Sequence, residues 1–176
     1  MGIRKLPDFL INQIAAGEVI ERPAYVVKEL VENSIDARAS EIEINILKAG
    51  KSNISVSDNG LGIEKTDLKL TVERHATSKL KDDDLYNLNF LGFRGEALPS
   101  IASVSELTIE SIKYKKKEAW GIFVQKNQLK DFFPSSRNVG TKVSVRNLFY
   151  SVPARLKFLK SDKGENAHSH QIIKKL

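Results

Sequence analysis

The first clear periodicity along the chain is helical. Apolar residues recur on one side of a 3.6-residue period between Val26 and Val31, shortly after Pro23, a residue that is tolerated in the first turn of a helix. Ser34 falls on the same side as these apolar residues. The pattern predicts a helix from Pro23 to about Ala37 with one buried face.

Two short segments then alternate between apolar and polar residues. Residues 42–46 (IEINI) and residues 54–58 (ISVSD) each place their apolar side chains on one face of an extended chain. The stretch between them, residues 49–53, contains a glycine and small polar residues, which is typical of a hairpin connection. The sequence therefore predicts two adjacent antiparallel strands.

A polar stretch from residue 60 to about residue 91 is long for a connection, and such a length is typical of a functional lid or of a disordered segment. A second helix is predicted to begin just after Gly95. The other predicted elements are strands over 107–112, 119–125 and 141–145 and helices over 153–159 and 165–176. We therefore expect one domain, residues 1–176, with an α+β fold: a two-layer sandwich in which a mixed, mostly antiparallel sheet carries its helices on one face.

Composition removes several classes of protein. The chain has 176 residues, of which 41% are hydrophobic, and it contains no cysteine, which excludes a disulfide scaffold and a thiolate zinc site. No apolar run approaches the ~20 residues that span a bilayer, so a soluble intracellular protein without a membrane partner is expected. The net charge of +6 allows a nucleotide or DNA as partner but does not require one.

The predicted first helix carries a polar stripe opposite its apolar face. Glu29, Asn33 and Asp36 stand at i, i+4 and i+7, so their side chains line one side of the helix. Such a stripe is typical of any solvated helix face. The functional alternative is that Glu29 acts as a general base and that Asn33 offers a hard oxygen to Mg²⁺.

Asp58 ends the second strand on the face that alternation predicts to be buried. A buried carboxylate needs hydrogen-bond donors, and the exocyclic amine of adenine is one such donor. Gly60 and Gly62 follow, which indicates either a sharp turn or a backbone lying against a flat ligand. Thr141 shares the inward face of its strand, where it either joins Asp58 in a base-recognition pocket or is an ordinary β-branched strand residue.

Two further segments suit anions. Residues 92–98 (GFRGEAL) join a pair of glycines to the start of a helix, where free backbone N–H groups favour negative charge. Residues 74–79 (RHATSK) combine two cations with an imidazole and two hydroxyls. The first segment is otherwise a simple helix start and the second a solvated loop, and no Walker A sequence occurs in the chain.

Taken in order, several strings of the chain resemble the N-terminal ATPase domain of the MutL mismatch-repair family. The strings are NQIAAGEVIERP (12–23), VKELVENSIDA (27–37), DNGLGI (58–63), RHATSK (74–79), GFRGEAL (92–98) and FYSVPAR (149–155). The helix with its asparagine and the Asp-x-Gly-x-Gly string alone indicate only the wider GHKL superfamily. The strings at 74–79 and 92–98 narrow the resemblance to MutL.

The resemblance implies the Bergerat (GHKL) ATP-binding fold, with ATP and Mg²⁺ as cofactors and a flexible ATP lid over about residues 60–94. It implies that Glu29 activates water for attack on the γ-phosphate, that Asn33 holds Mg²⁺, and that Asp58 accepts from the adenine N6 amine. The remaining nucleotide-binding positions that it implies are Asp36, Gly60, Gly62, Thr77, Ser78, Lys79, Gly92, Phe93, Arg94, Gly95, Glu96, Ala97, Leu98 and Thr141.

The function implied by the resemblance is Mg²⁺-dependent ATP binding and slow hydrolysis that drives N-terminal dimerisation in DNA mismatch repair. The implied partners are DNA, repair proteins of the MutS type and a second copy of the chain, in a bacterial cytoplasm or a eukaryotic nucleus. Because relatives bring a lysine to the γ-phosphate from a following domain, and dimerise through a C-terminal region, the chain is expected to be a fragment that hydrolyses ATP slowly. The alternatives are a nucleotide-gated switch without useful turnover and a basic DNA-binding module.

Overall fold

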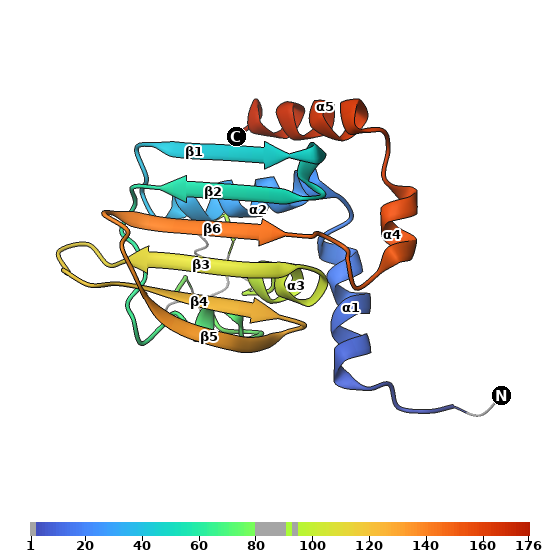
Figure 1. The fold of residues 1–176 in the computed structure, drawn as a ribbon, viewed down its shortest axis with the longest axis horizontal. Coiled ribbons are helices and arrows are strands. Elements are labelled where there is room, and N and C mark those ends of the chain that lie inside the picture. Colours follow the sequence, from blue (N-terminus) through green and yellow to red (C-terminus); the bar gives the residue numbers. More distant parts are fainter. Residues whose placement is uncertain (1–2, 80–90, 93–94) are drawn as a thin grey trace.

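The structure of this chain is a computed structural model that describes residues 3–79, 91–92 and 95–176 (Figure 1). Its helices are α1 (Asp8–Val19), α2 (Pro23–Asp36), α3 (Ala97–Val104), α4 (Pro153–Phe158) and α5 (Asp162–Ile173), with short 3₁₀ helices η1 (Lys48–Gly50) and η2 (Leu70–Val72). Its strands are β1 (Ile42–Leu47), β2 (Asn53–Asp58), β3 (Glu106–Ile112), β4 (Ala119–Gln125), β5 (Gln128–Ser135) and β6 (Gly140–Arg146).

The strands form one sheet in the order β1-β2-β6-β3-β4-β5, and each neighbouring pair among them is antiparallel. The register aligns one apolar row across five strands. This row runs through Ile44, Val56, Val143, Ile109 and Ile122. Because side chains alternate along each strand, this row and its neighbours give the sheet one apolar face.

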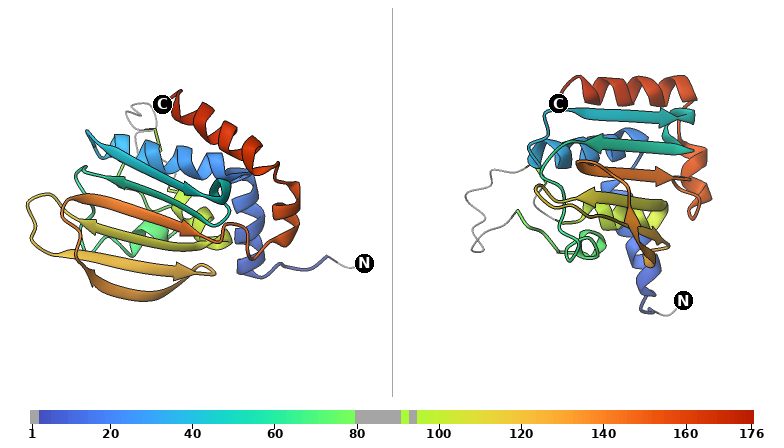
Figure 2. Two further views of the ribbon diagram at one scale, coloured as in Figure 1. Left: turned by 45° about the horizontal axis from the view of Figure 1, so that its top comes forward. Right: turned by 60° about the vertical axis from the view of Figure 1, so that its left-hand side comes forward.

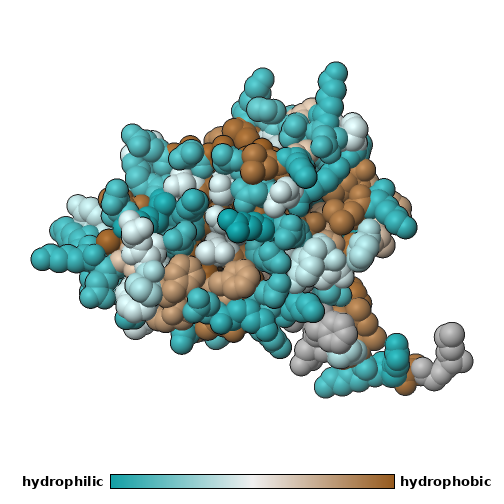
Figure 3. Space-filling view, viewed as in Figure 1, coloured by the Kyte–Doolittle hydropathy of each residue, from teal (hydrophilic) through white to brown (hydrophobic). Residues whose placement is uncertain are grey.

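Helices cover that apolar face. In Figure 1, α2 and α3 lie behind the sheet, and the two turned views place both helices on the same side of it (Figure 2). Val27 and Leu30 of α2 and Ile101 of α3 are buried in the core with the strands. The opposite face, turned to the viewer in Figure 3, is mainly hydrophilic. It carries the paired residues Ser55 and Ser144.

Helix α5 is anchored beside the start of α2. Glu165 of α5 is fully buried, and its carboxylate accepts from the Lys160 amide at 2.9 Å and lies 3.8 Å from the Arg22 guanidinium. Lys51 and Asp162 form an ion pair at 2.7 Å. The helices in the described parts of the chain are too short or too polar to cross a membrane.

The predicted fold class is confirmed, and the helix over α2 and the hairpin of β1 and β2 lie where the sequence pattern places them. The expected mostly antiparallel sheet is antiparallel at every described pairing. Periodicity did not predict α1, whose apolar residues follow no single face, or β5. Strand β5 has a polar start and contains Pro134, which an edge strand tolerates.

The first part of the polar stretch after residue 60 is packed rather than open. Leu68 is fully buried, and Ile63 and Val72 pack against the core. The lid expected over about residues 60–94 therefore begins with a section that belongs to the folded body of the domain.

Candidate functional site

Helix α2 connects the two halves of the candidate site. On its inner side, the Ser34 hydroxyl lies 3.2 Å from the Leu30 carbonyl oxygen and 3.0 Å from Asp58 Oδ2. On its outer side, Asn33 and Asp36 contact the segment that ends at Lys79. The adjacent residues Ser34 and Asn33 thus contact two different parts of the molecule. Ser34 contacts strand β2, and Asn33 contacts the loop that contains Lys79.

Asp58 is buried, with 7% of its surface exposed, and the site supplies the donors that the sequence argument required. Its Oδ1 accepts from the Gly60 amide at 2.8 Å and from the Thr141 amide at 3.2 Å, while Oδ2 accepts from Ser34. A carboxylate offers about four acceptor positions. Three protein donors therefore hold the carboxylate in place and leave Oδ2 able to accept one more hydrogen bond.

The glycines around Asp58 are fixed by close backbone approach. Gly62 has φ +66° and Gly140 has φ +70°, conformations that L side chains rarely adopt. A Cβ at Gly62 would overlap the Ile112 carbonyl oxygen, and one at Gly140 would overlap the Asp58 carbonyl oxygen. The geometry at Gly62 therefore shows a sharp turn with close backbone approach, and a role of Gly60 and Gly62 beside a ligand stays a prediction.

A buried hydroxyl pair extends the site away from Asp58. Thr141 is 8% exposed, and its Oγ1 lies 2.8 Å from Ser111 Oγ. Ser111 Oγ also lies 3.1 Å from the Gly140 carbonyl oxygen and accepts from the Ile63 amide at 2.8 Å. The hydroxyls therefore tie β3, β6 and the turn after Gly62 into one polar network.

Arg137 supports the strand end that carries Asp58. Its Nη2 donates to the Asp58 carbonyl oxygen at 2.6 Å and to Ser57 Oγ at 3.0 Å. Burial lowers the pKa of Arg137, although the negative charges of Asp58, Glu110 and Glu43 oppose that shift. The guanidinium thus holds the main chain of Asp58 from the face of the sheet opposite the helices.

The outer side of α2 forms a second cluster around Lys79. Lys79 Nζ donates to Asn33 Oδ1 at 2.8 Å and to Asp36 Oδ2 at 2.6 Å. The amides of Leu91 and Gly92 also donate to Asp36, at 3.1 and 3.2 Å. Burial opposes ionisation of Asp36, but the Lys79 and backbone hydrogen bonds outweigh it, so the pKa of Asp36 lies below its ordinary value of 3.8.

We expect Asp36→Asn to lower the free energy of unfolding by about 2 kcal/mol at neutral pH, because it removes charge-assisted hydrogen bonds. The folded-state pKa of Asp36 is depressed, so this stabilisation is present above about pH 4 and is lost as the pH falls through the folded-state pKa. Urea unfolding of both proteins at pH 7 and at about pH 3 measures the difference.

The matched control for this experiment is Asp162→Asn, because Asp162 is 59% exposed in its ion pair with Lys51. We expect that change to cost under about 1 kcal/mol. A cost of Asp36→Asn that is equal at both pH values would contradict the assigned ionisation.

Glu29 lies on the same side of α2 and is only loosely held. Its side chain is 23% exposed, and its Oε1 is 3.5 Å from Lys28 Nζ, which makes its shorter contact, 2.8 Å, with Glu32 Oε2. Burial favours neutral Lys28, yet the hydrogen bond to Glu32 and the charges of both glutamates raise its pKa. Lys28 is therefore committed to Glu32, and Glu29 is free to engage another group.

The remaining predicted positions lie in the segment that ends at Lys79 and around the start of α3. Thr77 Oγ1 accepts from the Lys79 amide at 3.2 Å, whereas Ser78 is exposed. Glu96 pairs with His75 at 3.0 Å, and Gly95, with φ +62°, turns close to the Ala76 carbonyl. Ala97 and Leu98 begin α3, and Leu98 packs against the core. The predicted Phe93 and Arg94 lie outside the described residues.

Sequence reasoning did not assign Ser34, Ser111 or Arg137 to the site. Ser34 and Ser111 each carried a detectable signal, because each is a polar residue at a position that periodicity predicts to be buried. Arg137 carried none, because it lies in the connection between β5 and β6 where a basic residue is ordinary.

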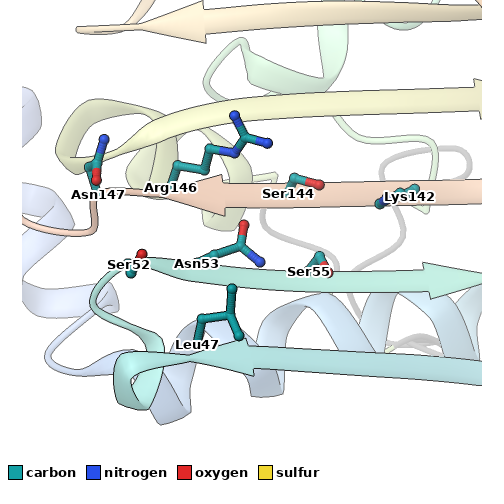
Figure 4. A pocket seen from close by; sticks show the side chains of 8 residues that line it. All are labelled: Leu47, Ser52, Asn53, Ser55, Lys142, Ser144, Arg146 and Asn147. Atoms are coloured by element: carbon teal, nitrogen blue, oxygen red, sulfur yellow. The ribbon is translucent and has the colours of Figure 1, made fainter.

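A hollow of about 350 Å³ lies on the opposite face of the sheet (Figure 4). Its lining includes the short side chains of Ser55 and Ser144 and the longer ones of Leu47, Asn53 and Arg146. Asp58 and Ser55 belong to the same strand but point to opposite faces, because they are three residues apart. The hollow is therefore separate from the network around Asp58.

The described residues contain no group of three or more histidine, cysteine or acidic side chains that could hold a metal ion by themselves. Mg²⁺ in nucleotide sites needs only one or two protein oxygens, because phosphates and waters supply the rest. Asn33 Oδ1 is such an oxygen, and it already faces a cation, the Lys79 ammonium. The donor chemistry at Asn33 thus fits a magnesium ion that arrives with a nucleotide.

Comparison with known proteins relates the chain to a large ATPase family. Residues 21–138 match the family described as histidine kinase-, DNA gyrase B-, and HSP90-like ATPase. The chain is 53% identical to the DNA mismatch repair protein MutL of Paramagnetospirillum magneticum, over 100% of its own length and 29% of that protein. It is 54% identical to MutL of Lactococcus lactis, over 99% of its own length and 27% of that protein.

Solved structures share the fold. The Aquifex aeolicus MutL ATPase domain complexed with ADP matches with a TM-score of 0.73 and 38% identity, covering 89% of this chain and 55% of that chain. The N-terminal domain of a DNA repair protein matches with a TM-score of 0.77 and 33% identity, covering 93% of this chain and 47% of that chain. The chain spans less than a third of the length of the mismatch repair proteins that it matches.

Proposed function

This chain belongs to the family of histidine kinase-, DNA gyrase B-, and HSP90-like ATPases, and its resemblance to the N-terminal ATPase domain of MutL is confirmed. We therefore propose that it binds ATP alongside helix α2, at the end of the sheet that carries Asp58, and hydrolyses the bond between the β- and γ-phosphates. The adenine end of this site is the network around Asp58, and the phosphate end is the cluster around Asn33, Asp36 and Lys79.

The observation that carries the proposal is the double role of α2. Ser34 orients the Asp58 carboxylate from one side of the helix, while its neighbour Asn33 meets the Lys79 ammonium on another side. A nucleotide that gives its exocyclic amine to Asp58 extends along this helix, so its triphosphate reaches the turn that carries Asn33 and Glu29. One rigid helix thus fixes the spacing between base recognition and phosphate chemistry.

In the proposed mechanism, Glu29 orients a water molecule and accepts its proton during attack on the γ-phosphate. Its loose 3.5 Å contact with Lys28 leaves the carboxylate available for that task. Phosphoryl transfer depends mainly on positioning and on compensation of charge, so Lys79 and the backbone amides at Gly92 and Gly95 would hold the phosphates. When the nucleotide enters, Lys79 exchanges its contacts with Asn33 and Asp36 for phosphate oxygens.

Magnesium enters this proposal through Asn33. A Mg²⁺ ion held there would neutralise charge on the phosphate oxygens. The amide oxygen of Asn33 must then leave its 2.8 Å hydrogen bond with Lys79. Ammonium and metal are thus alternative partners of the same oxygen.

The wider role that we propose is the one that the MutL resemblance implies. We propose a lid over about residues 60–94, of which the first section, with Leu68 and Val72 packed against the core, stays in the folded body. ATP binding would promote dimerisation of N-terminal domains in DNA mismatch repair, with DNA and repair proteins of the MutS type as partners. The compartment that we propose is the one that contains the DNA, which is the cytoplasm of a bacterium or the nucleus of a eukaryote. Phe93, Arg94, Thr77 and Ser78 stay proposed contributors to the phosphate site.

Calorimetric titration with a non-hydrolysable ATP analogue tests the phosphate end. We expect Mg²⁺ to raise the affinity of the unmodified chain, and Asn33→Ala to remove most of that gain, because the metal loses its protein ligand. Asn45→Ala, at an exposed position of β1, is the matched control and should leave the gain unchanged. An equal Mg²⁺ gain in the Asn33→Ala chain would show that the metal site lies elsewhere.

A further inference from the structure

Lysines gather at one end of the sheet, outside the nucleotide site. Three of them follow Tyr114 directly in the hairpin between β3 and β4, and a fourth precedes it at the start of that hairpin. Two more lie in the segment before η2. Together they are Lys65, Lys69, Lys113, Lys115, Lys116 and Lys117. We call these six residues the hairpin lysines. In Figure 1 this hairpin extends from the left end of the sheet, where Figure 3 shows a dense group of hydrophilic side chains.

Contacts between side chains join the two segments into one surface. Lys116 Nζ lies 3.7 Å from Glu64 Oε1, which connects the hairpin to the turn before η2. Lys65 Nζ lies 3.2 Å from the centroid of the Trp120 ring, and Lys69 Nζ lies 5.0 Å from that of Phe132. The Trp120 and Phe132 rings are stacked at 5.1 Å. The stacked aromatic pair therefore supports the two lysines of the turn before η2, and the Lys116–Glu64 ion pair joins that turn to the hairpin.

The surface is hollowed, and more lysines than acidic residues line the hollow. Its volume is about 310 Å³, and four of the hairpin lysines line it against only two carboxylates, those of Glu64 and Glu118. Like charges that converge repel one another, and an anion in their midst removes that repulsion. Trp120, the single tryptophan of the chain, forms part of the wall.

An exposed aromatic residue distinguishes this patch from an ordinary solvated hairpin. Tyr114 is 62% exposed at the hairpin, and Lys115 Nζ lies 5.5 Å from the centroid of its ring. Lysine ammonium groups neutralise the phosphates of a nucleic-acid backbone, and a tyrosine hydroxyl can donate a hydrogen bond to a phosphate oxygen. A single small phosphate would engage only part of a surface that extends from Lys69 to Lys117.

We propose that the hairpin lysines and Tyr114 form a contact surface for the phosphate backbone of duplex DNA. The choice of DNA rests on the proposed function in mismatch repair, whereas the anion site itself rests on the geometry. Ser111 links the two sites physically, because it lines the hollow and also contacts Thr141 at 2.8 Å in the Asp58 network. DNA bound here lies next to the proposed adenine site without entering it.

The test is binding of a fluorescently labelled DNA duplex to the 176-residue chain at several salt concentrations, without nucleotide. The variant is Lys115→Gln, Lys116→Gln and Lys117→Gln together. The matched control is Lys126→Gln, Lys130→Gln and Lys163→Gln, which removes as many charges outside the patch and includes one residue, Lys126, with a positive φ like that of Lys115. Tryptophan emission reports whether the DNA reaches Trp120.

We expect the hairpin variant to lose about tenfold or more in affinity at low salt and to reduce the slope of log K against log salt by about 2 to 3. The control should keep most of the affinity, and DNA should change the emission of Trp120 in the unmodified chain. No DNA binding by the unmodified chain, an equal loss in the control, or lysine-dependent binding to phosphatidylserine vesicles in place of DNA would overturn the proposal.

Calorimetry with the ATP analogue on the same proteins separates this proposal from the proposed function. ATP binding that persists in the hairpin variant while DNA binding falls supports both. DNA binding that depends on these lysines in a chain that binds no ATP refutes the nucleotide site alone. ATP binding with DNA affinity that does not depend on the hairpin lysines refutes the DNA surface alone.

Discussion

Asp58→Asn is expected to weaken ATP binding by about 100-fold or more while leaving the fold intact. The asparagine oxygen can still accept from the Gly60 and Thr141 amides, and its amide nitrogen can donate to the Ser34 hydroxyl. The same nitrogen then faces the exocyclic amine of adenine. Both groups are hydrogen-bond donors, so the hydrogen bond that the Asp58 carboxylate accepts from adenine is lost. Calorimetry with a non-hydrolysable ATP analogue measures the loss.

Two comparisons make this prediction specific. Ser34→Ala removes one donor from Asp58 but keeps the acceptor, so we expect a much smaller loss of affinity, about tenfold or less. The unmodified chain should also prefer ATP to GTP, because guanine presents a carbonyl oxygen in place of the amine. Equal binding of ATP by the Asp58→Asn chain, at an unchanged melting temperature, would contradict the assignment of Asp58.

Glu29→Gln is expected to lower the rate of phosphate release by about 100-fold or more, because a positioned general base contributes about that much to a rate. The affinity for ATP should stay within about twofold, since among the described residues Glu29 forms its ion pair with Lys28 and no hydrogen bond joins it to Asp58 or Lys79. Release of inorganic phosphate under saturating ATP measures the first quantity, and calorimetry measures the second.

Glu21→Gln is the control for this change, because Glu21 is exposed and lies just before the same helix. It should leave both quantities unchanged. If the Glu29→Gln chain releases phosphate at the unmodified rate, Glu29 is not the base. If instead it loses ATP affinity, the carboxylate serves binding and not the chemical step.

The strongest sequence signals came from residues that break a pattern. Asp58 is a charged residue at an inward position of a strand, and alternation alone was enough to predict a buried carboxylate with donors around it. The same reasoning, applied to Ser34 on the apolar side of α2, would have found its hydrogen bond to Asp58. Local periodicity is therefore informative wherever a buried polar residue must have a partner.

Other parts of the site depend on tertiary contacts that periodicity does not contain. The meeting of Lys79 with Asn33 and Asp36 joins residues more than forty positions apart, and no local pattern predicts it. The contact of Arg137 with the Asp58 carbonyl joins a loop to a strand end in the same way. Spacing alone left the polar stripe of α2 open to two interpretations, and the MutL resemblance favoured the functional one.

The hydrophobic periodicity of the sequence predicted the helices and strands of the fold wherever that periodicity is strong. The β1 and β2 hairpin and helix α2 have strong periods, and both were predicted within about one residue at most ends. Strand β5 lies at the edge of the sheet, where one side of the strand needs no partner and polar residues are tolerated. Its weak signal is a consequence of that position.

A crystal structure of this chain soaked with a non-hydrolysable ATP analogue and Mg²⁺ would show whether Asp58 and Asn33 lie at the two ends of one nucleotide site. We expect adenine against α2, with its amine within hydrogen-bond distance of Asp58 Oδ2, and a metal ion in place of Lys79 beside Asn33 Oδ1. A nucleotide bound in the hollow on the opposite face of the sheet, with Asp58 still contacting only Ser34, Gly60 and Thr141, would contradict this expectation.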